Sequence, residues 1–209
     1  MKVRILFLIC FLSITCLLNA ADKPVIQIHT DNSSLIFRVA DNGRLYQSYL
    51  GKKLNHEADI SHLPQGTEAY ITHGMEDYFE PAIHILHNDG NPSLLLKYVS
   101  HETKAVSQGV NETIITLGDD KYPVTVKLHY VTYPAEDIIK TYTEISHKEK
   151  KPVVLHQYAS SMLHLNRAKY YLTEFSGDWA HEANISDQPL EFGKKVLDTK
   201  LGARANMFT

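Results

Sequence analysis

Short runs of alternating apolar and polar residues, separated by turn residues, fill most of the chain. In residues 124–133, Val124, Val126, Leu128 and Tyr130 fall on one face and mainly polar residues fall on the other. This period of two is typical of a half-buried strand, because successive strand side chains point to opposite faces. Roughly ten or eleven such runs recur about every 8–12 residues without a long amphipathic helix, which predicts an all-β antiparallel sandwich.

The other strands are expected where β-branched and aromatic residues lie between turn residues. Their ranges are 25–29, 35–39, 44–50, 82–85, 93–100, 112–117, 138–146, 153–165 and 170–175. In the run 153–165 only the β-branched start favours a strand, and residues 159–165 are ambiguous. Asn42-Gly43 indicates a hairpin, because both residues tolerate the positive φ that tight hairpin turns require. Residues 55–75 are weakly patterned and rich in Gly, Pro and His, so we expect a loop there.

Residues 1–21 have the organisation of a secretory signal peptide. Lys2 and Arg4 precede the apolar residues 5–18, and Asn19-Ala20-Ala21 offers a small-residue cleavage site. We therefore expect an exported protein, periplasmic or extracellular, that is not held in a membrane after cleavage. Residues 22–209 would then form one β-sandwich domain.

Cysteine content and charge exclude several kinds of site in residues 22–209. Cys10 and Cys16 both lie in the expected signal peptide, so the remaining chain has no thiol for a disulfide, a nucleophile or a metal site. Removing Lys2 and Arg4 changes the formal net charge from -3 to -5. No basic stripe is present, so nucleic acid is not an expected partner.

The candidate ligands and carboxylates do not form a recognisable catalytic motif. The 12 histidines include no His-Glu-x-x-His spacing, so we expect neither a metal site nor a cofactor. Glycoside hydrolysis needs two carboxylates, for which Asp77 with Glu80 or Asp178 with Glu182 could be nominated. Nothing in their sequence context indicates a raised pKa, so we interpret them as surface or interface carboxylates.

The most informative stretch is residues 170–205, which holds Trp179, the only tryptophan. Its Gly-x-Trp-small-x-Glu, Pro-Leu and glycine spacing resembles the N-terminal domain of bacterial α-galactosidases of glycoside hydrolase family 36. The matching residues are Gly177, Trp179, Glu182, Pro189, Leu190, Gly193 and Gly202. Lys200, Ala203 and Ala205 depart from the arginine and serine that usually flank the last glycine.

The resemblance implies a β-super-sandwich of the galactose-mutarotase type, followed in the family by a (β/α)₈ barrel that carries two catalytic aspartates. A barrel needs about 250 residues, so this chain would be a secreted, non-catalytic N-terminal domain, incomplete at its C-terminus. The parent enzyme would hydrolyse terminal α-galactosides such as raffinose or melibiose in the barrel. The domain would brace that barrel. Some family members are oligomers, so a homo-oligomer is among the implied partnerships.

The resemblance also assigns packing or interface roles to five residues, none of them catalytic. Trp179 is the expected packing anchor, and it could equally line a domain interface or a sugar site, since both bury aromatics. Gly177 and Gly202 are expected at turns or close backbone approaches. Asp178 and Glu182 are candidates for hydrogen bonds at the domain border.

A second function, a stand-alone carbohydrate-binding β-sandwich, stays open from the sequence. It requires an aromatic platform on one exposed face. Tyr46, Tyr49, Tyr130 and Tyr133 all lie on expected strands, where the alternation does not separate platform from core.

Overall fold

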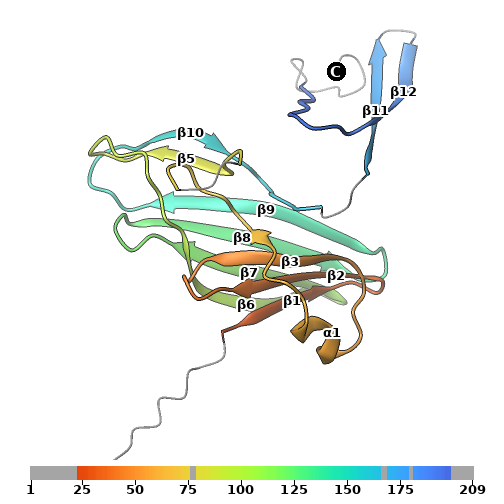
Figure 1. Cartoon of the computed structure of the whole chain (residues 1–209), viewed down its shortest axis with the longest axis horizontal. Helices are drawn as coiled ribbons and strands as arrows, with labels where there is room; N and C mark the ends of the chain where they lie inside the picture. The colour runs from red at the N-terminus through yellow and green to blue at the C-terminus, as the bar shows by residue number, and fades with distance from the viewer. Residues whose placement is uncertain (1–22, 76–78, 166–168, 179–180, 199–209) are drawn as a thin grey trace, which may run out of the picture. The chain divides into compact units, whose positions relative to one another are not determined.

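The computed structural model describes residues 23–75, 79–165, 169–178 and 181–198. The chain divides into two compact units, Met1–Leu163 and His164–Thr209, which are called unit 1 and unit 2. Nearly all regular structure in both units is antiparallel β-sheet (Figure 1). The all-β antiparallel prediction is therefore confirmed.

The first sheet of unit 1 has the strand order β1-β2-β3-β4. Its strands are β1 (Val25–His29), β2 (Ser33–Val39), β3 (Leu45–Lys52) and β4 (Thr67–Glu68). The turn between β2 and β3 is the predicted Asn-Gly hairpin, and Gly43 has a φ of 79°. The register pairs Val39 with Leu45 next to that turn.

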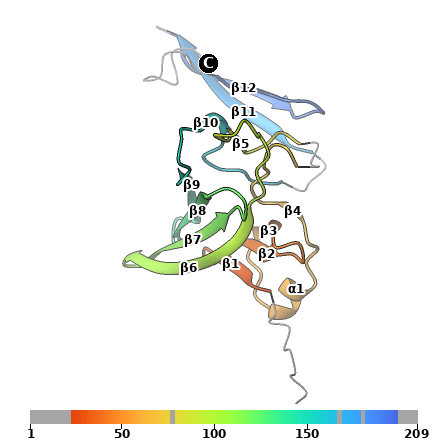
Figure 2. The same ribbon diagram turned by 90° about the vertical axis from the view of Figure 1, so that its left-hand side faces the viewer.

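The second sheet is a four-stranded meander with the order β6-β7-β8-β9. It consists of β6 (Lys97–Ser107), β7 (Val110–Gly118), β8 (Val124–Tyr133) and β9 (Ile138–His147). The β8–β9 ladder is regular from Val124↔His147 to Tyr133↔Ile138. Strand β6, by contrast, carries two irregularities in its pairing with β7, so this edge strand bends (Figure 2).

The two sheets lie face to face and share one hydrophobic core (Figure 2). The rings of Phe37 in β2 and Tyr130 in β8 meet across the layers with centroids 5.1 Å apart. The side chains that alternate inward are almost completely buried: Ile26, Ile28, Leu35, Phe37 and Leu45 from the first sheet, and Ile115, Leu117, Val124, Val126, Leu128 and Tyr130 from the second. Hydrophobic burial of these alternating positions is what the period-two pattern encodes.

The expected loop at residues 55–75 is wrong in one respect, because it contains a helix. Helix α1 (Glu57–Ser61) is a single short turn, and the strand β4 follows it. The Arg38 guanidinium, on the outer face of β2, donates to the carbonyl of Ile60 and so fixes α1 outside the first sheet. Five residues are too few to show a helical period in the sequence.

A third, two-stranded sheet completes unit 1. It pairs β5 (Ile83–Leu86) with β10 (Val154–Tyr158), with an irregularity between Leu155 and Gln157. Ile83 and Ile85 point into the core, whereas every residue of β10 is exposed or only half buried. The predicted strand at 153–165 is therefore too long, since it ends at Tyr158.

The predicted strand at 93–100 also has different bounds. Leu94 and Leu96 alternate into the core, but the backbone between them is outside the ladder. The N–H of Leu95 donates to the carboxylate of Asp119 (2.6 Å) instead of to a neighbouring strand. The alternation was therefore interpreted correctly as burial, and wrongly as sheet pairing.

Unit 2 is a β-hairpin, β11 (Tyr171–Asp178) with β12 (His181–Pro189), followed by an irregular segment to residue 198. The sequence pattern predicted only the first of these two strands. Strand β12 was not predicted, because its sequence is mainly small and polar and lacks the β-branched alternation that is typical of a strand.

Candidate functional site

The family-like signature lies on the hairpin of unit 2. The ladder runs from Tyr171↔Pro189 to Asp178↔His181, with an irregularity between Ser176 and Asp178. Gly177 is the residue at that irregularity and is buried. Two residues of β12, Glu182 and Ala183, lie opposite it, so the extra residue of this β-bulge is on β12. The turn or close backbone approach expected at Gly177 stays a prediction.

The other predicted interface residues are placed only in part. Asp178 is the last residue of β11 and Glu182 the second of β12, so the backbone brings them to the same end of the hairpin. Trp179 and Gly202 lie outside the described residues. The roles predicted for Trp179, Asp178, Glu182 and Gly202 stay predictions.

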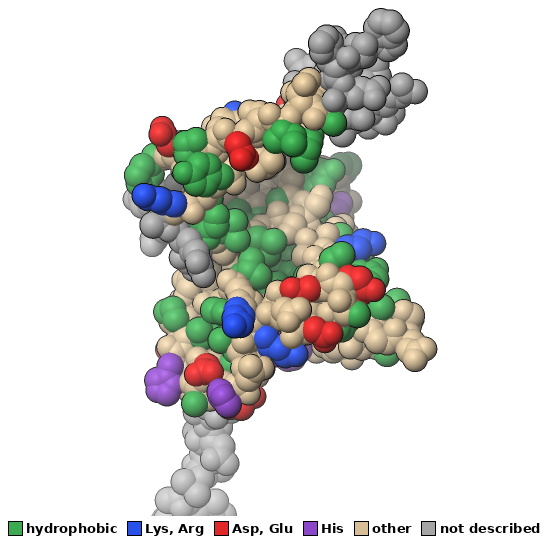
Figure 3. Space-filling model, turned by 90° about the vertical axis from the view of Figure 1, so that its right-hand side faces the viewer, with side chains coloured by type: hydrophobic (Ala, Val, Ile, Leu, Met, Phe, Trp, Pro, Cys, Tyr) green, Lys and Arg blue, Asp and Glu red, His purple; other side chains and the backbone are tan. Residues whose placement is uncertain are grey.

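One face of the hairpin is apolar and exposed. Phe175 and Ile185 are directly opposite in the ladder, and they are 53% and 67% exposed. Tyr171 lies on the same face, two alternations from Phe175, and is 70% exposed. Figure 3 shows hydrophobic side chains on the surface of this hairpin. The hairpin thus presents three large apolar side chains on one face, which are exposed among its described residues. The hydrogen-bonded pair Thr173 and Asp187 lies between Tyr171 and Phe175 on that face.

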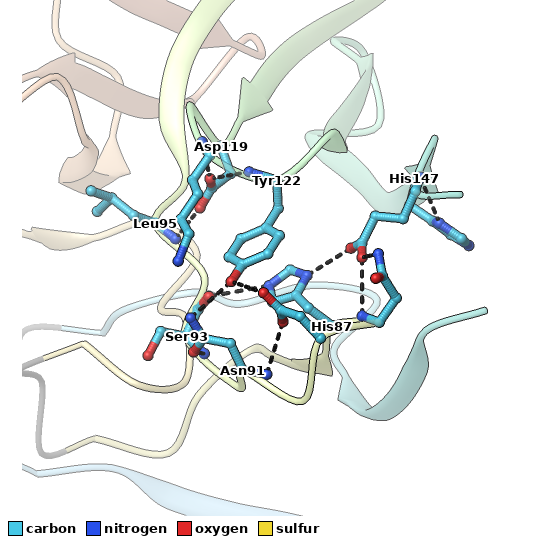
Figure 4. A network of polar contacts seen from close by, with 11 residues as sticks. His87, Asn91, Ser93, Leu95, Asp119, Tyr122 and His147 are labelled. Carbon is cyan, nitrogen blue, oxygen red and sulfur yellow. Dashed lines mark hydrogen bonds and ion pairs between the residues drawn. The ribbon is translucent and has the colours of Figure 1, made fainter. Parts of the chain in front are cut away.

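Unit 1 contains a buried polar network that joins three loops, shown in Figure 4. The network, called the His87 network, is centred on His87, whose Nδ1 lies 2.7 Å from a carboxylate oxygen of Glu149. Its Nε2 lies 3.1 Å from the carbonyl oxygen of Ser93. Both ring nitrogens therefore face a hydrogen-bond acceptor, one a carboxylate and the other a backbone carbonyl. The two side chains are 0% and 1% exposed.

Glu149 is satisfied on both oxygens. The backbone N–H of Asn88 donates to its second oxygen (3.0 Å), and the Asn88 amide donates there too. Burial by itself raises the pKa of Glu149, but the hydrogen bonds from His87 and Asn88 outweigh it, so the pKa is lowered. A carboxylate with a lowered pKa and no open position is a structural anion, not a general acid or base.

Tyr122 closes the His87 network on the other side. Its ring stacks on His87 with centroids 3.6 Å apart and planes 7° apart. Its hydroxyl donates to Asp89 (3.0 Å) and accepts from the amide of Asn91 (2.8 Å). No sequence signal could have found this network, because His87 and Glu149 are 62 residues apart and neither belongs to a motif.

A second polar group, called the Glu112 cluster, lies on the outer face of the β6–β9 sheet. One oxygen of Glu112 accepts from the Tyr142 hydroxyl (2.6 Å) and from Nδ1 of His129 (2.9 Å). The other oxygen lies 3.1 Å from the Lys104 ammonium. The hydrogen bonds from Tyr142 and His129 lower the pKa of Glu112 to about 2. Such a group stays ionised at neutral pH and cannot supply the proton that glycoside cleavage needs.

The nominated carboxylate pairs do not gain support as catalytic pairs. Asp77 lies outside the described residues, and Glu80 accepts a hydrogen bond from the Gln157 amide (3.3 Å). In the described ranges, no group of three or more His, Asp or Glu side chains is arranged to hold a metal ion. None of the described helices is long and apolar enough to cross a membrane.

Surface charges of both signs are intermixed on the face of unit 1 that Figure 3 shows. Unit 1 also has isolated exposed ion pairs, such as Lys97 with Asp120 and Lys23 with Asp41. Exposed pairs of this kind contribute little to stability. This face shows no basic stripe of the sort that binds nucleic acid.

Comparison with solved structures supports the fold. The chain is similar to the galactosidase domain of alpha-galactosidase-sucrose kinase, AgaSK, with 21% identity and a TM-score of 0.72. It is also similar to the family 36 α-galactosidase AgaA from Geobacillus stearothermophilus, with 19% identity and a TM-score of 0.73. Each match covers 81% of this chain and 28% of the other chain.

Curated relatives match at the sequence level. The chain is 23% identical over 147 residues to the Probable alpha-galactosidase G of Aspergillus terreus, a match that covers 64% of this chain. Alpha-galactosidase C of Emericella nidulans matches equally, at 23% over 147 residues. The chain spans about a fifth of the length of these relatives, 20% in each case.

The family itself is shown by a match over most of the chain. Residues 43–208 match the Glycosyl hydrolase family 36 N-terminal domain, a range that includes the second and third sheets of unit 1 and the hairpin of unit 2. The chain therefore belongs to the glycosyl hydrolase family 36 N-terminal domain family.

Proposed function

We propose that this chain is the non-catalytic N-terminal domain of an α-galactosidase that hydrolyses terminal α-galactosides. The observation that carries the proposal is the family match over residues 43–208 in a chain that spans only 20% of its curated α-galactosidase relatives. The remaining four fifths of those relatives leave ample length for a catalytic barrel of about 250 residues.

The substrate class follows from the same relationship. Solved structures of AgaA variants contain raffinose in one case and stachyose in another. Both sugars end in an α-linked galactose, so we propose the same class of terminal α-galactosides for the parent enzyme of this chain. Its two catalytic carboxylates would lie on the barrel, as in the family that this chain resembles. Glu149 and Glu112, the carboxylates of the two polar groups described above, are held in structural hydrogen bonds.

The mechanical role of the domain would be to brace the barrel. The apolar face of the hairpin, with Tyr171, Phe175 and Ile185, supports this role. Exposed apolar patches commonly mark interaction sites. A homo-oligomer in which the domain also contacts a second subunit is a further part of the proposal.

Export is proposed from residues 1–21 alone, with the periplasm or the extracellular space as the destination. The compared proteins include fungal as well as bacterial enzymes. The bacterial origin expected from the sequence is therefore also a proposal.

The alternative, a stand-alone carbohydrate-binding module, lacks a supporting observation. Tyr130 is 4% exposed and packs on Phe37 in the core. Tyr46, Tyr49 and Tyr133 are half buried. Because Tyr130 lies in the core, the four tyrosines do not form one exposed platform.

The test is hydrolysis of a chromogenic α-galactoside by two purified proteins. One is residues 22–209, and the other is the same sequence followed by a family 36 catalytic barrel. We expect activity only in the longer protein. Binding of raffinose to residues 22–209 would be measured in parallel by titration calorimetry, and no binding is expected. Hydrolysis by the short protein would overturn the non-catalytic assignment, and raffinose binding without hydrolysis would favour the alternative.

A further inference from the structure

Three histidines from three separate segments form a row of ring contacts in unit 1. The ring centroids of His73 and His84 are 3.8 Å apart, with planes 22° apart. His84 and His156 follow with centroids 4.8 Å apart and planes 36° apart. His84 belongs to β5 and His156 to β10, whereas His73 lies in the connection between β4 and β5. The three rings are called the histidine stack.

The strand irregularity explains how His156 reaches the stack. Leu155 pairs with Ile85 and Gln157 pairs with His84, so His156 is the extra residue of a β-bulge. A bulge turns its side chain away from the regular alternation. His156 can therefore lie on the same side as His84, whose two neighbours in β5, Ile83 and Ile85, point into the core.

The ring geometry favours stacking over metal binding. The lone pair of a ring nitrogen lies in the plane of its ring, so nearly parallel rings direct their lone pairs side by side and not at a common point. This agrees with the lack of a metal-ligand group in the described part of the chain. His73 and His84 lie face to face, and His84 and His156 make a tilted ring contact. Neutral imidazoles tolerate such contacts, whereas two imidazolium ions repel each other.

Strand β10 has few other contacts along its length. Val154 is 50% exposed and Tyr158 is 64% exposed, and β5 is the strand with which β10 pairs. A two-stranded sheet without a covering layer is marginal in water. Its C-terminal end is better held, because the N–H of Ala159 donates to Ala82 (2.7 Å) and the Tyr70 hydroxyl donates to Ala159 (2.7 Å).

Protonation of one of these rings would place a positive charge inside the histidine stack. Partial burial lowers the pKa of His84, and the neighbouring charges of His73 and His156 lower it further. On the adjoining segment, Glu80 accepts a hydrogen bond from Gln157 (3.3 Å), the residue that follows His156, so it is the carboxylate that we expect to offset part of the repulsion. A histidine whose pKa is lowered by folding takes up its proton more readily in the open state. Acid therefore favours opening, starting as the pH falls through about 6.5.

We propose that the histidine stack is an acid-sensitive connection, which holds β10 on β5 at neutral pH and loosens that pairing in mild acid. Strand β10 is the last strand of unit 1 before unit 2 begins at His164. Loosening it frees the segment through which the chain continues to the hairpin. The device is a local opening equilibrium, and unfolding of the sandwich core is not part of it.

The experiment measures amide hydrogen exchange of residues 154–158 at pH 7.5 and pH 5.0. Results are expressed as protection factors, which remove the pH dependence of the intrinsic exchange rate. We expect protection in β10 to fall about tenfold in acid, which corresponds to about 1.4 kcal/mol, while protection in β8 stays unchanged. The double variant His84→Phe/His156→Phe keeps aromatic rings without protons and should lose the acid effect.

Two controls make the result specific. His62→Gln changes an exposed histidine next to α1, so the fall in protection should persist. Glu80→Gln removes the offsetting carboxylate, so the fall should become larger. Equal protection of β10 at both pH values, or an undiminished fall in the double variant, would overturn the proposal.

A second measurement avoids dependence on the folding of the variants. The three rings are titrated in the unaltered protein by nuclear magnetic resonance. Coupled rings should titrate over a broadened pH range, with His84 the last to take up a proton as the pH falls. Three independent titrations close to pH 6.5 would contradict the proposal even if no variant folds.

Discussion

The two units of this chain bury their apolar residues to very different degrees. In unit 1, Phe37 and Ile115 are 0% exposed and belong to a core that both large sheets share. In unit 2, Phe175 and Ile185 are more than half exposed, although they face each other in a regular ladder. The family match covers both units, over residues 43–208, but the signature that carried the resemblance in the sequence lies in the second unit, whose described residues form no comparable core.

The alternating pattern that predicts the sandwich and the signature that carries the family resemblance therefore lie in different units. Unit 1 follows from the alternation of its own strands, which many unrelated sequences could satisfy. A two-stranded hairpin is marginal by itself. A long hairpin with an apolar face makes physical sense when another surface covers that face.

Truncating the core should have the largest effect. Phe37→Ala removes a completely buried ring that packs on Tyr130, and we expect a loss of about 3–5 kcal/mol in the free energy of unfolding. A urea titration followed by tyrosine fluorescence or circular dichroism measures it. Val106→Ala, at a position that is 56% exposed, is the matched control and should change stability by less than about 0.5 kcal/mol. A loss below about 1 kcal/mol for Phe37→Ala would mean that Phe37 is not buried between the two sheets as described.

The His87 network should come next in size. Glu149→Gln keeps the shape of the side chain but leaves the buried His87 ring without its carboxylate, so we expect a loss of about 2–4 kcal/mol at pH 7. The control is Asp120→Asn, which removes an exposed ion pair with Lys97 and should cost less than about 0.5 kcal/mol. Equal losses in the two variants would show that burial of the His87–Glu149 pair does not add to its contribution to the free energy of unfolding.

The strands that the sequence predicted well are those whose burial alternates. For β8 the predicted and observed bounds coincide, and for β9 they differ by one residue, because every second side chain of each faces the core. The hairpin at Gly43 was also predictable, since its backbone needs a positive φ that few residues adopt. Both signals are local, and local signals can be read from one sequence.

The features that the sequence did not predict depend on long-range contacts or on weak patterns. The His87–Glu149 pair joins loops that only the folded sandwich brings together. The histidine stack depends on a bulge at His156, which the periodicity of the sequence does not predict. Strand β12 is polar, so its pairing with β11 is visible only in the structure. Of the interface residues that the family resemblance named, Gly177 lies opposite a bulge of β12, and the roles expected for Gly177 and Trp179 stay predictions.

The Glu112 cluster should give a smaller, pH-dependent effect. A pKa lowered from 4.5 to about 2 stabilises the folded state above pH 4.5, and this contribution is lost as the pH falls from 4.5 towards 2. The cluster lies at the outer surface of the sheet, so solvent screening reduces the expected contribution to about 1–2 kcal/mol. Glu112→Gln should cost that amount at pH 7 and nothing near pH 2. A cost that is independent of pH would mean that Glu112 acts by packing and not by charge.

The smallest effect is expected on the hairpin, and it tests the comparison most directly. Ile185→Ser removes an apolar side chain that is 67% exposed, so its cost in this chain should be below about 0.5 kcal/mol. In a longer protein that includes the catalytic barrel, the same change should cost about 1–3 kcal/mol if the face becomes buried there. Ser186→Ala, on the opposite face of β12, should be neutral in both proteins. The informative quantity is the difference between the two proteins, because a side chain that matters only in the longer one has its contacts outside this chain. If Ile185→Ser is neutral in both, the apolar face is not the surface that braces the barrel. The role of the signature would then have to lie in Trp179 and its neighbours.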